Sequence, residues 1–322
     1  MTNHTALAQP SVDVLIDLVL TRRLDVADGV VELTFTAPDG TDLPAWEPGA
    51  HLDLLLAPDL DRQYSLCGPR GPETAAEWTV AVRREAESRG GSALMHDLAV
   101  GAALRCRMPR NHFTFAPVEG PVTFVAGGIG ITPLLPMIEA ATAAGRTWVL
   151  HYAGRSRASM AYAERLVTTY GDRVRLHVDD EGTGLDLSGV VQGATQVWCC
   201  GPAGMLAAAE ELGLAAGVPV HVEHFTPKEV GAHVDTAFEI EAGGRVFEVP
   251  ADRSALDVIE EEGFLVVSSC REGTCGTCET VLLEGEGDHR DSILSSGEQA
   301  ENRLFYPCVS RARSPRLVLD LF

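Results

Sequence analysis

Four of the eight cysteines lie together in the last sixth of the sequence, at spacings that suit a metal-thiolate site. Three follow the pattern C-x4-C-x2-C, and 29 residues separate the third from the fourth. This spacing is that of plant-type 2Fe-2S centres. A tight loop that bears three ligands needs a freely turning backbone, which Gly273 and Gly276 supply. The expected cluster ligands are Cys270, Cys275, Cys278 and Cys308.

A structural zinc site is the alternative for these four thiols. Zinc sites usually contain two short ligand pairs, whereas this sequence has one C-x2-C pair and a distant fourth cysteine. The stretch REGTCGTCE also offers backbone N–H groups that can hydrogen-bond to sulfur and help to set a reduction potential. We therefore favour an iron-sulfur cluster over zinc at these four cysteines. The other cysteines are scattered or lie on strand-like sequence, and a cytosolic chain is not expected to form a disulfide framework.

The stretch SCREGTCGTCE, with HRDSILS and PCVSRA downstream, resembles the ferredoxin domain at the C-terminus of phthalate dioxygenase reductase and its relatives. The resemblance extends over essentially the whole chain. It implies that the flavin is FMN rather than the dinucleotide and that the electron donor is NADH. It also implies that the electron acceptor is a Rieske-type oxygenase or O-demethylase that acts on an aromatic substrate.

The sequence RQYSL lies where an antiparallel strand is expected to pass a ligand. Its arginine can bind a phosphate, its tyrosine offers a flat face to an isoalloxazine ring, and its serine can bond to the redox-active flavin nitrogen. A Gly-rich turn downstream can complete the phosphate cradle. Taken alone, the motif equally fits a core tyrosine beside a solvated arginine, but it resembles the flavin motif of the ferredoxin-reductase superfamily. The expected flavin residues are Arg62, Gln63, Tyr64, Ser65, Leu66, Arg89, Gly90, Gly91 and Ser92.

A second Gly-rich turn follows an expected strand and precedes an expected helix, so its backbone can approach a pyrophosphate at a helix N-terminus. Thr132 is the expected N-cap and Pro133 the first helical residue. The turn departs from the Rossmann fingerprint, because Pro133 replaces the third glycine and no acidic residue ends the next strand. The alternative to a nucleotide site is a plain tight turn. The departure from the Rossmann fingerprint, however, resembles G-G-x-G-I-T-P, the typical form in the ferredoxin-reductase superfamily. The expected residues are Gly127, Gly128, Gly130, Thr132 and Pro133.

Further nicotinamide residues follow from the same resemblance. Cys200, Gly201, Pro202 and Met205 resemble the C-G-P segment beside the nicotinamide, where Cys200 positions the reacting ring carbon and is not a nucleophile. Cys199 is expected to be a buried strand residue. Phe225 either stacks over the flavin until nicotinamide displaces it or is an ordinary hydrophobic residue at a domain end. The residues expected near the adenosine are Arg155, Ser156 and Arg157, which suit the 2′-phosphate of NADPH or cover NADH.

The formal net charge of −21 argues against nucleic acid or a membrane surface as the main partner and favours a basic protein partner. Residues 236–322 hold 17 acidic and 8 basic residues, a net charge of −9, which suits docking to a basic patch. The first 20 residues suggest neither a signal peptide nor a spanning helix, so the expected location is the cytoplasm. The histidines, His51 and His224 among them, show no metal-binding spacing and are expected to be structural.

Three patterns of periodicity along the chain predict three domains. Short alternating runs separated by turns indicate an antiparallel β-barrel that binds flavin, at residues 10–116. Strand, glycine turn and helix then alternate, which indicates a parallel α/β nucleotide-binding domain at 117–225. After a linker at 226–235, a hairpin turning at Gly243–Gly244 and a short helix capped by Ser254 and Asp257 begin a β-grasp ferredoxin domain at 236–322. The expected fold is multidomain α+β.

These motifs together predict an NAD(P)H-dependent flavin iron-sulfur reductase that converts a two-electron donor into single-electron steps. A Rieske-type oxygenase is the favoured acceptor, and a cytochrome P450 is the alternative. A second class of function is a non-catalytic electron carrier or redox sensor, which would keep the cluster without flavin turnover.

Overall fold

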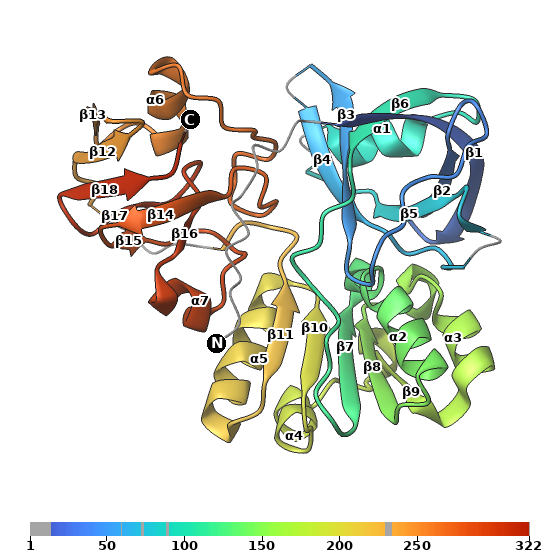
Figure 1. The fold of residues 1–322 in the computed structure, drawn as a ribbon. Coiled ribbons are helices and arrows are strands. Elements are labelled where there is room, and N and C mark those ends of the chain that lie inside the picture. Colours follow the sequence, from blue (N-terminus) through green and yellow to red (C-terminus); the bar gives the residue numbers. More distant parts are fainter. Residues whose placement is uncertain (1–13, 59, 72–73, 88–89, 229–233, 322) are drawn as a thin grey trace.

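The computed structural model describes residues 14–58, 60–71, 74–87, 90–228 and 234–321. Its strands form three main sheets, which give the molecule three lobes (Figure 1). In this view the N-terminal barrel lies at the upper right, the parallel sheet lies below it, and the C-terminal sheet lies at the upper left. The expected multidomain α+β architecture is confirmed.

The N-terminal lobe is an antiparallel sheet with the strand order β4-β3-β6-β1-β2-β5 within the described residues. A bridge between Leu66 and Val80 joins its two edge strands and closes the barrel. Large apolar side chains fill the interior, because burial of apolar area is the main favourable term in folding. The strands are β1 (Leu15–Ala27), β2 (Val30–Thr36), β3 (His51–Ala57), β4 (Leu60–Ser65), β5 (Trp78–Arg83) and β6 (Ala103–Arg107). Helix α1 (Gly91–Asp97) packs against β4 and β5.

The second lobe is a parallel sheet with the order β11-β10-β7-β8-β9. The order reverses between β7 and β10, so a crevice opens at the carboxyl ends of these two strands, where α/β folds bind ligands. The strands are β7 (Val122–Gly127), β8 (Trp148–Gly154), β9 (Val174–Val178), β10 (Val197–Cys200) and β11 (Val220–Glu223). The helices are α2 (Leu134–Ala143), α3 (Ala163–Tyr170), α4 (Leu187–Gln192) and α5 (Ala203–Ala216).

The start of α2 corrects one expectation. Thr132 is not the N-cap, because a 3-10 turn at Gly128–Ile131 comes first and Pro133 takes the N-cap position before Leu134. Thr132 already has helical torsion angles (φ −58°, ψ −50°). Its hydroxyl donates a hydrogen bond to the carbonyl oxygen of Ile129 (3.0 Å). Further 3-10 turns lie at Arg157–Ser159, Gly171–Arg173 and Asp179–Glu181.

The C-terminal lobe is a mixed sheet with the order β13-β12-β18-β14-β16, packed against α6 in the β-grasp arrangement. Its hairpin turns at Gly243–Gly244, which both have positive φ, and Ser254 caps α6 by accepting from the backbone N–H of Asp257. Both local predictions are confirmed. The elements are β12 (Phe238–Ala242), β13 (Arg245–Val249), α6 (Ala255–Glu261), β14 (Thr280–Glu284), β15 (Gly287–Asp288), α7 (Ser296–Glu301), β16 (Leu304–Phe305), β17 (Arg311–Ala312) and β18 (Arg316–Leu319).

None of the helices in the described part of the chain has the length and hydrophobicity needed to span a bilayer.

Candidate functional site

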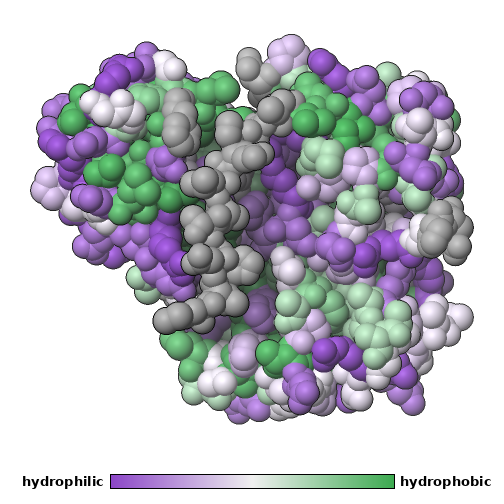
Figure 2. All heavy atoms as spheres, in the orientation of Figure 1, coloured by the Kyte–Doolittle hydropathy of each residue, from purple (hydrophilic) through white to green (hydrophobic). Residues whose placement is uncertain are grey.

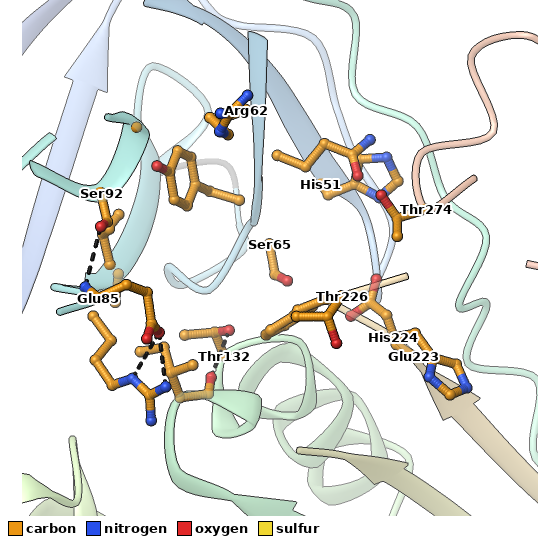
Figure 3. A pocket seen from close by; sticks show the side chains of 18 of the residues that line it. His51, Arg62, Ser65, Glu85, Ser92, Thr132, Glu223, His224, Thr226 and Thr274 are labelled. Atoms are coloured by element: carbon orange, nitrogen blue, oxygen red, sulfur yellow. Dashed lines mark hydrogen bonds and ion pairs between the residues drawn. The ribbon is translucent and has the colours of Figure 1, made fainter. Parts of the chain in front are cut away.

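A cavity of about 410 Å³ lies where the three lobes meet. Strand β4 and the start of α1 form one wall, the 3-10 turn before α2 and the end of β11 form another, and Thr274 of the cysteine loop completes it. Figure 3 shows Ser65 near the centre, with His51 and Thr274 on one side. Eight of the expected site residues line this cavity: Arg62, Gln63, Tyr64, Ser65, Gly91, Ser92, Thr132 and Phe225.

The cavity wall contains buried polar atoms that have no hydrogen-bond partner among the described residues. They are the hydroxyl oxygen of Ser65, one carboxylate oxygen of Glu223, and the Nε2 atoms of His51 and His224. Buried polar groups in native proteins are almost always paired. These atoms therefore suit a large ligand that carries several donors and acceptors, as the isoalloxazine ring of a flavin does.

One end of the cavity suits a phosphate. Gly91 packs against Arg62 so closely that a Cβ at position 91 would lie 2.5 Å from the Arg62 Cγ. Gly90 has φ +98°, a conformation that glycine adopts at little cost. The hydroxyl of Ser92 accepts from the backbone N–H of Glu85 (3.1 Å), which fixes the turn beside β5. The Gly-rich turn and the arginine of β4 therefore lie together, as a phosphate cradle requires.

Three expected flavin residues do not line the cavity. Leu66 is fully buried in the barrel core, and its N–H donates to the carbonyl oxygen of Ala50 (2.9 Å). Gly90 lies just outside the lining, before the first helical residue of α1. Arg89 lies outside the described residues.

The two nicotinamide segments meet at the crevice between β7 and β10. A Cβ on Gly130 would lie 2.2 Å from the carbonyl oxygen of Cys200, so backbone packs directly on backbone there. Gly127 is equally confined, since a Cβ would lie 2.6 Å from Pro202 and 2.9 Å from Met205. The structure thus brings the G-G-x-G turn and the C-G-P segment together beside the cavity.

Cys200 and Glu223 lie where these two segments meet, at the ends of β10 and β11. They are paired neighbours on the parallel strands β10 and β11. Burial raises the pKa of Glu223 to about 8, and burial followed by the charge of Glu223 raises the pKa of Cys200 well above its usual range. The thiol of Cys200 therefore stays protonated at neutral pH, which agrees with a positioning role and not with a nucleophilic one. Cys199 is fully buried, as expected.

Arg155, Ser156 and Arg157 follow β8, outside the residues that line the cavity. Arg157 forms a two-fold ion pair with Glu181, with Nε–Oε1 at 2.5 Å and Nη2–Oε2 at 2.9 Å. Ser156 and Ser159 bond to each other and fix the turn. An acidic residue therefore does stand beside this segment, contributed by the end of β9 and not by β8.

Phe225 lies in the cavity wall directly after β11 and is 43% exposed. A large, half-exposed aromatic ring at a cavity suits stacking on a flat ligand.

The expected cluster ligands form two thiol pairs. The side chains of Cys270 and Cys275 are within hydrogen-bond contact, as are those of Cys278 and Cys308. Among the described residues, no three His, Cys, Asp or Glu side chains gather closely enough for a single metal ion. Two pairs suit a two-iron cluster, in which each iron takes two thiolates. Gly273 and Gly276 both have positive φ, as the tight loop requires.

Backbone N–H groups point at two of these sulfurs. Glu272 donates to the Sγ of Cys270 (3.3 Å), and Thr277 donates to the Sγ of Cys275 (3.4 Å). Such bonds stabilise negative charge on thiolates and help to set the potential of a cluster. The donor set therefore fits a 2Fe-2S centre.

Sequence reasoning missed several lining residues. His51 was expected to be structural, yet it faces the cavity, and burial lowers its pKa to about 4. Glu223, His224 and Thr274 were also not selected. The position of Glu223 at the end of β11, two residues before Phe225, was the available signal.

Comparisons with known proteins agree with this geometry. Residues 238–313 match the family model of the 2Fe-2S iron-sulfur cluster binding domain. The phenoxybenzoate dioxygenase subunit beta of Ectopseudomonas oleovorans is 40% identical over 304 residues, which cover 92% of this chain and 94% of that protein. The solved phthalate dioxygenase reductase, described as a modular structure for electron transfer from pyridine nucleotides to [2Fe-2S], is 33% identical with a TM-score of 0.66 and covers 95% of this chain and 98% of its own.

A second similar structure is that of an intact type IV self-sufficient cytochrome P450 monooxygenase. It is 38% identical with a TM-score of 0.87 and covers 95% of this chain. This chain spans 41% of that longer chain.

Proposed function

Because this chain belongs to the phthalate dioxygenase reductase family, we propose that it transfers electrons from NADH through FMN and a 2Fe-2S cluster to a terminal oxygenase. One observation carries the proposal: a single cavity is lined by the RQYS strand, by the end of the nucleotide-binding sheet and by Thr274 of the cluster loop. Donor, flavin and cluster sites therefore adjoin one another. We propose the residue ranges 10–116, 117–225 and 236–322 as the three domains, joined by 226–235.

The flavin site is proposed from the cavity wall. Arg62, Gly91 and Ser92 would bind the phosphate, Tyr64 would pack on the ring, and the buried hydroxyl of Ser65 would hydrogen-bond to the ring. When bound, FMN accepts two electrons from the nicotinamide and releases them singly, which a one-electron cluster requires.

The nicotinamide site is proposed at the adjoining crevice. The Gly127–Gly128–Gly130 turn would bind the pyrophosphate, and Cys200 with Gly201 would support the ring. At neutral pH Glu223 stays largely protonated, so its carboxyl can donate a hydrogen bond to the nicotinamide amide. Phe225 would cover the flavin ring and exclude water until nicotinamide replaces it.

We propose a Rieske-type aromatic-ring oxygenase or O-demethylase as the acceptor. The full-length likeness to a dioxygenase subunit and to phthalate dioxygenase reductase favours it. A cytochrome P450 is the second candidate, because the self-sufficient P450 contains a region of similar structure. We propose the cytoplasm as the location, since NADH and reduced thiols are maintained there.

The test measures iron, zinc, flavin and the visible spectrum on one anaerobic sample, together with NADH-driven cytochrome c reduction. The proposal expects two irons and one FMN per chain, and NADH-dependent activity. Cluster absorbance without flavin or activity after reconstitution would favour an electron carrier or redox sensor. Zinc at the four cysteines would overturn the proposed electron route. Turnover with a candidate oxygenase or P450 then decides between acceptors.

A further inference from the structure

Three polar side chains join the barrel to the cluster loop beside the cavity. Asp53 on β3 and Arg110 after β6 come from the barrel, and Thr277 comes from between two cluster cysteines. The Thr277 hydroxyl donates to Asp53 Oδ2 (3.2 Å), Arg110 donates to the same oxygen (3.2 Å), and Arg110 also donates to the Thr277 hydroxyl. We call these three residues the polar seam.

The polar seam is largely removed from solvent. The side chain of Asp53 is 1% exposed, and Thr277 is 9% exposed. A buried carboxylate is costly unless it is paired and hydrogen-bonded. Within the barrel, Gln63 and Arg110 each donate to one oxygen of Asp53, and the docked cluster loop adds a third hydrogen bond from Thr277. Figure 2 shows hydrophilic residues in the recess between the C-terminal lobe and the barrel.

Each end of the seam reaches one of the redox sites. Gln63, which lines the cavity, donates to the other oxygen of Asp53 (2.8 Å). At the opposite end, the N–H of Thr277 donates to the sulfur of Cys275 (3.4 Å). A continuous run of hydrogen bonds thus connects the cavity wall to a cluster ligand.

Steric contact beside the seam fixes the same loop. A Cβ on Gly276 would lie 2.1 Å from the Nε2 of His112, and Gly276 has φ +72°. The His112 ring stacks on that of His51, with centroids 5.9 Å apart, and His51 lines the cavity. The cluster loop therefore packs directly against His112, with no room for a side chain at position 276.

We propose that the polar seam is a positioning device that holds the cluster loop against the flavin cavity during electron transfer. Domains of one chain move relative to each other unless their interface is large and hydrophobic, so a polar interface gains orientation from specific bonds. The inference rests on the proposed function. Each NADH oxidised gives NAD⁺, one proton and two electrons; the electrons cross here singly, and each converts one ferric iron to ferrous.

The test is anaerobic stopped-flow reduction of Thr277→Val holoprotein by NADH, followed separately at flavin and cluster wavelengths. Valine keeps the shape of threonine and removes the hydroxyl. We expect flavin reduction, the KM for NADH and the EPR signal of the cluster to be unchanged. Transfer from flavin to cluster should slow about tenfold, which corresponds to about 1.4 kcal/mol. A transfer rate equal to that of the wild type would overturn the inference.

Two controls separate positioning from general damage to the loop. Thr277→Ser keeps the hydroxyl and should restore the wild-type rate. Thr280→Val removes a buried hydroxyl that donates to the carbonyl of Cys278, within the same lobe, and should leave the rate unchanged. Equal slowing in Thr280→Val, or no recovery in Thr277→Ser, would show that the slower electron transfer does not come from loss of the polar seam.

A double-mutant cycle tests the partner. Asp53→Ala combined with Thr277→Val should slow transfer less than the product of the two single effects, because both changes remove the bond between Thr277 and Asp53. Independent, multiplying effects would contradict the proposed contact. If the wild-type protein showed no NADH-dependent flavin reduction at all, the proposed function would fail; normal transfer in Thr277→Val would instead refute the seam alone.

Discussion

Glu223 and Cys200 lie side by side at the carboxyl ends of β11 and β10, where one carboxylate oxygen of Glu223 is buried without a hydrogen-bond partner among the residues that the structure describes. This oxygen faces the cavity, so burial raises the pKa of Glu223 from an ordinary 4.5 to about 8. A carboxyl that stays protonated at neutral pH is a hydrogen-bond donor. The junction between flavin and nicotinamide therefore offers a neutral acid beside a neutral thiol.

The raised pKa of Glu223 predicts how stability depends on pH. Between pH 4.5 and 8 the folded protein holds a proton that the unfolded chain releases, so this stabilising contribution is complete below pH 4.5 and is lost as pH rises to about 8. The free energy of unfolding should fall by an amount on the order of 3 kcal/mol over this range, after allowance for partial exposure. Glu223→Gln should remove this pH dependence, which thermal unfolding of flavin-free protein from pH 5 to 9 can measure.

The exposed Glu211→Gln variant is the control, and its melting curve should follow that of the wild type. Parallel pH profiles for the wild type and Glu223→Gln would show that Glu223 is ionised normally.

Local features were predictable from the sequence because neighbouring residues determine them. The Gly243–Gly244 turn, the Ser254 cap and the cysteine spacing each depend on a few adjacent positions. Thr132 failed as an N-cap because a 3-10 turn precedes α2 and the helix starts one residue later than expected.

The cavity could not be assembled from sequence in the same way. His51, Glu223 and Thr274 come from three different lobes, and only the packing of those lobes brings them together. Similarly, the partner of Arg157 is supplied by the end of β9, although the Rossmann pattern directs attention to the end of β8. Long-range packing therefore determines which polar residues face the ligand.

Gly91→Ala should weaken flavin binding. A Cβ would lie 2.5 Å from Cγ and 3.0 Å from Cδ of Arg62, so the guanidinium must leave its position. Loss of one charge-assisted hydrogen bond costs about 1.5–3 kcal/mol, so the Kd for FMN should rise at least about tenfold. Fluorescence titration of flavin-free protein with FMN gives the value.

Gly184→Ala is the matched control, because position 184 has no neighbour within 4 Å of a new Cβ and no positive φ. It should bind FMN as the wild type does. If Gly91→Ala bound FMN with the Kd of the wild type, Arg62 would not be a phosphate ligand.

Glu181→Gln should shift the preference between the two nicotinamide donors. The carboxylate now neutralises Arg157 through two bonds and presents an acceptor suited to a ribose hydroxyl. Without it, Arg157 can pair with the 2′-phosphate of NADPH. Since the ion pair is exposed and screened by solvent, the NADPH-to-NADH ratio of kcat/KM should rise only about threefold to fivefold.

Asp172→Asn serves as the control for charge alone, since it removes an exposed negative charge from another turn of the same lobe. Its ratio should stay at the wild-type value. An equal rise in both variants would mean that net charge, and not the Arg157 pair, governs the preference.

Cys275→Ser should separate the two halves of the electron route. A serine hydroxyl is a harder and less acidic ligand than a thiol and cannot replace it in a cluster of soft sulfur ligands. We expect loss of cluster absorbance and a fall in NADH-driven cytochrome c reduction to about 1% or less, because even changes to outer partners of metal ligands cost 10–100-fold. Ferricyanide reduction should continue, since the flavin residues on β4 and α1 are untouched. Cys199→Ala, at a fully buried strand position, should keep both activities. Full cytochrome c activity in Cys275→Ser would mean that electrons leave the flavin without passing through the four cysteines.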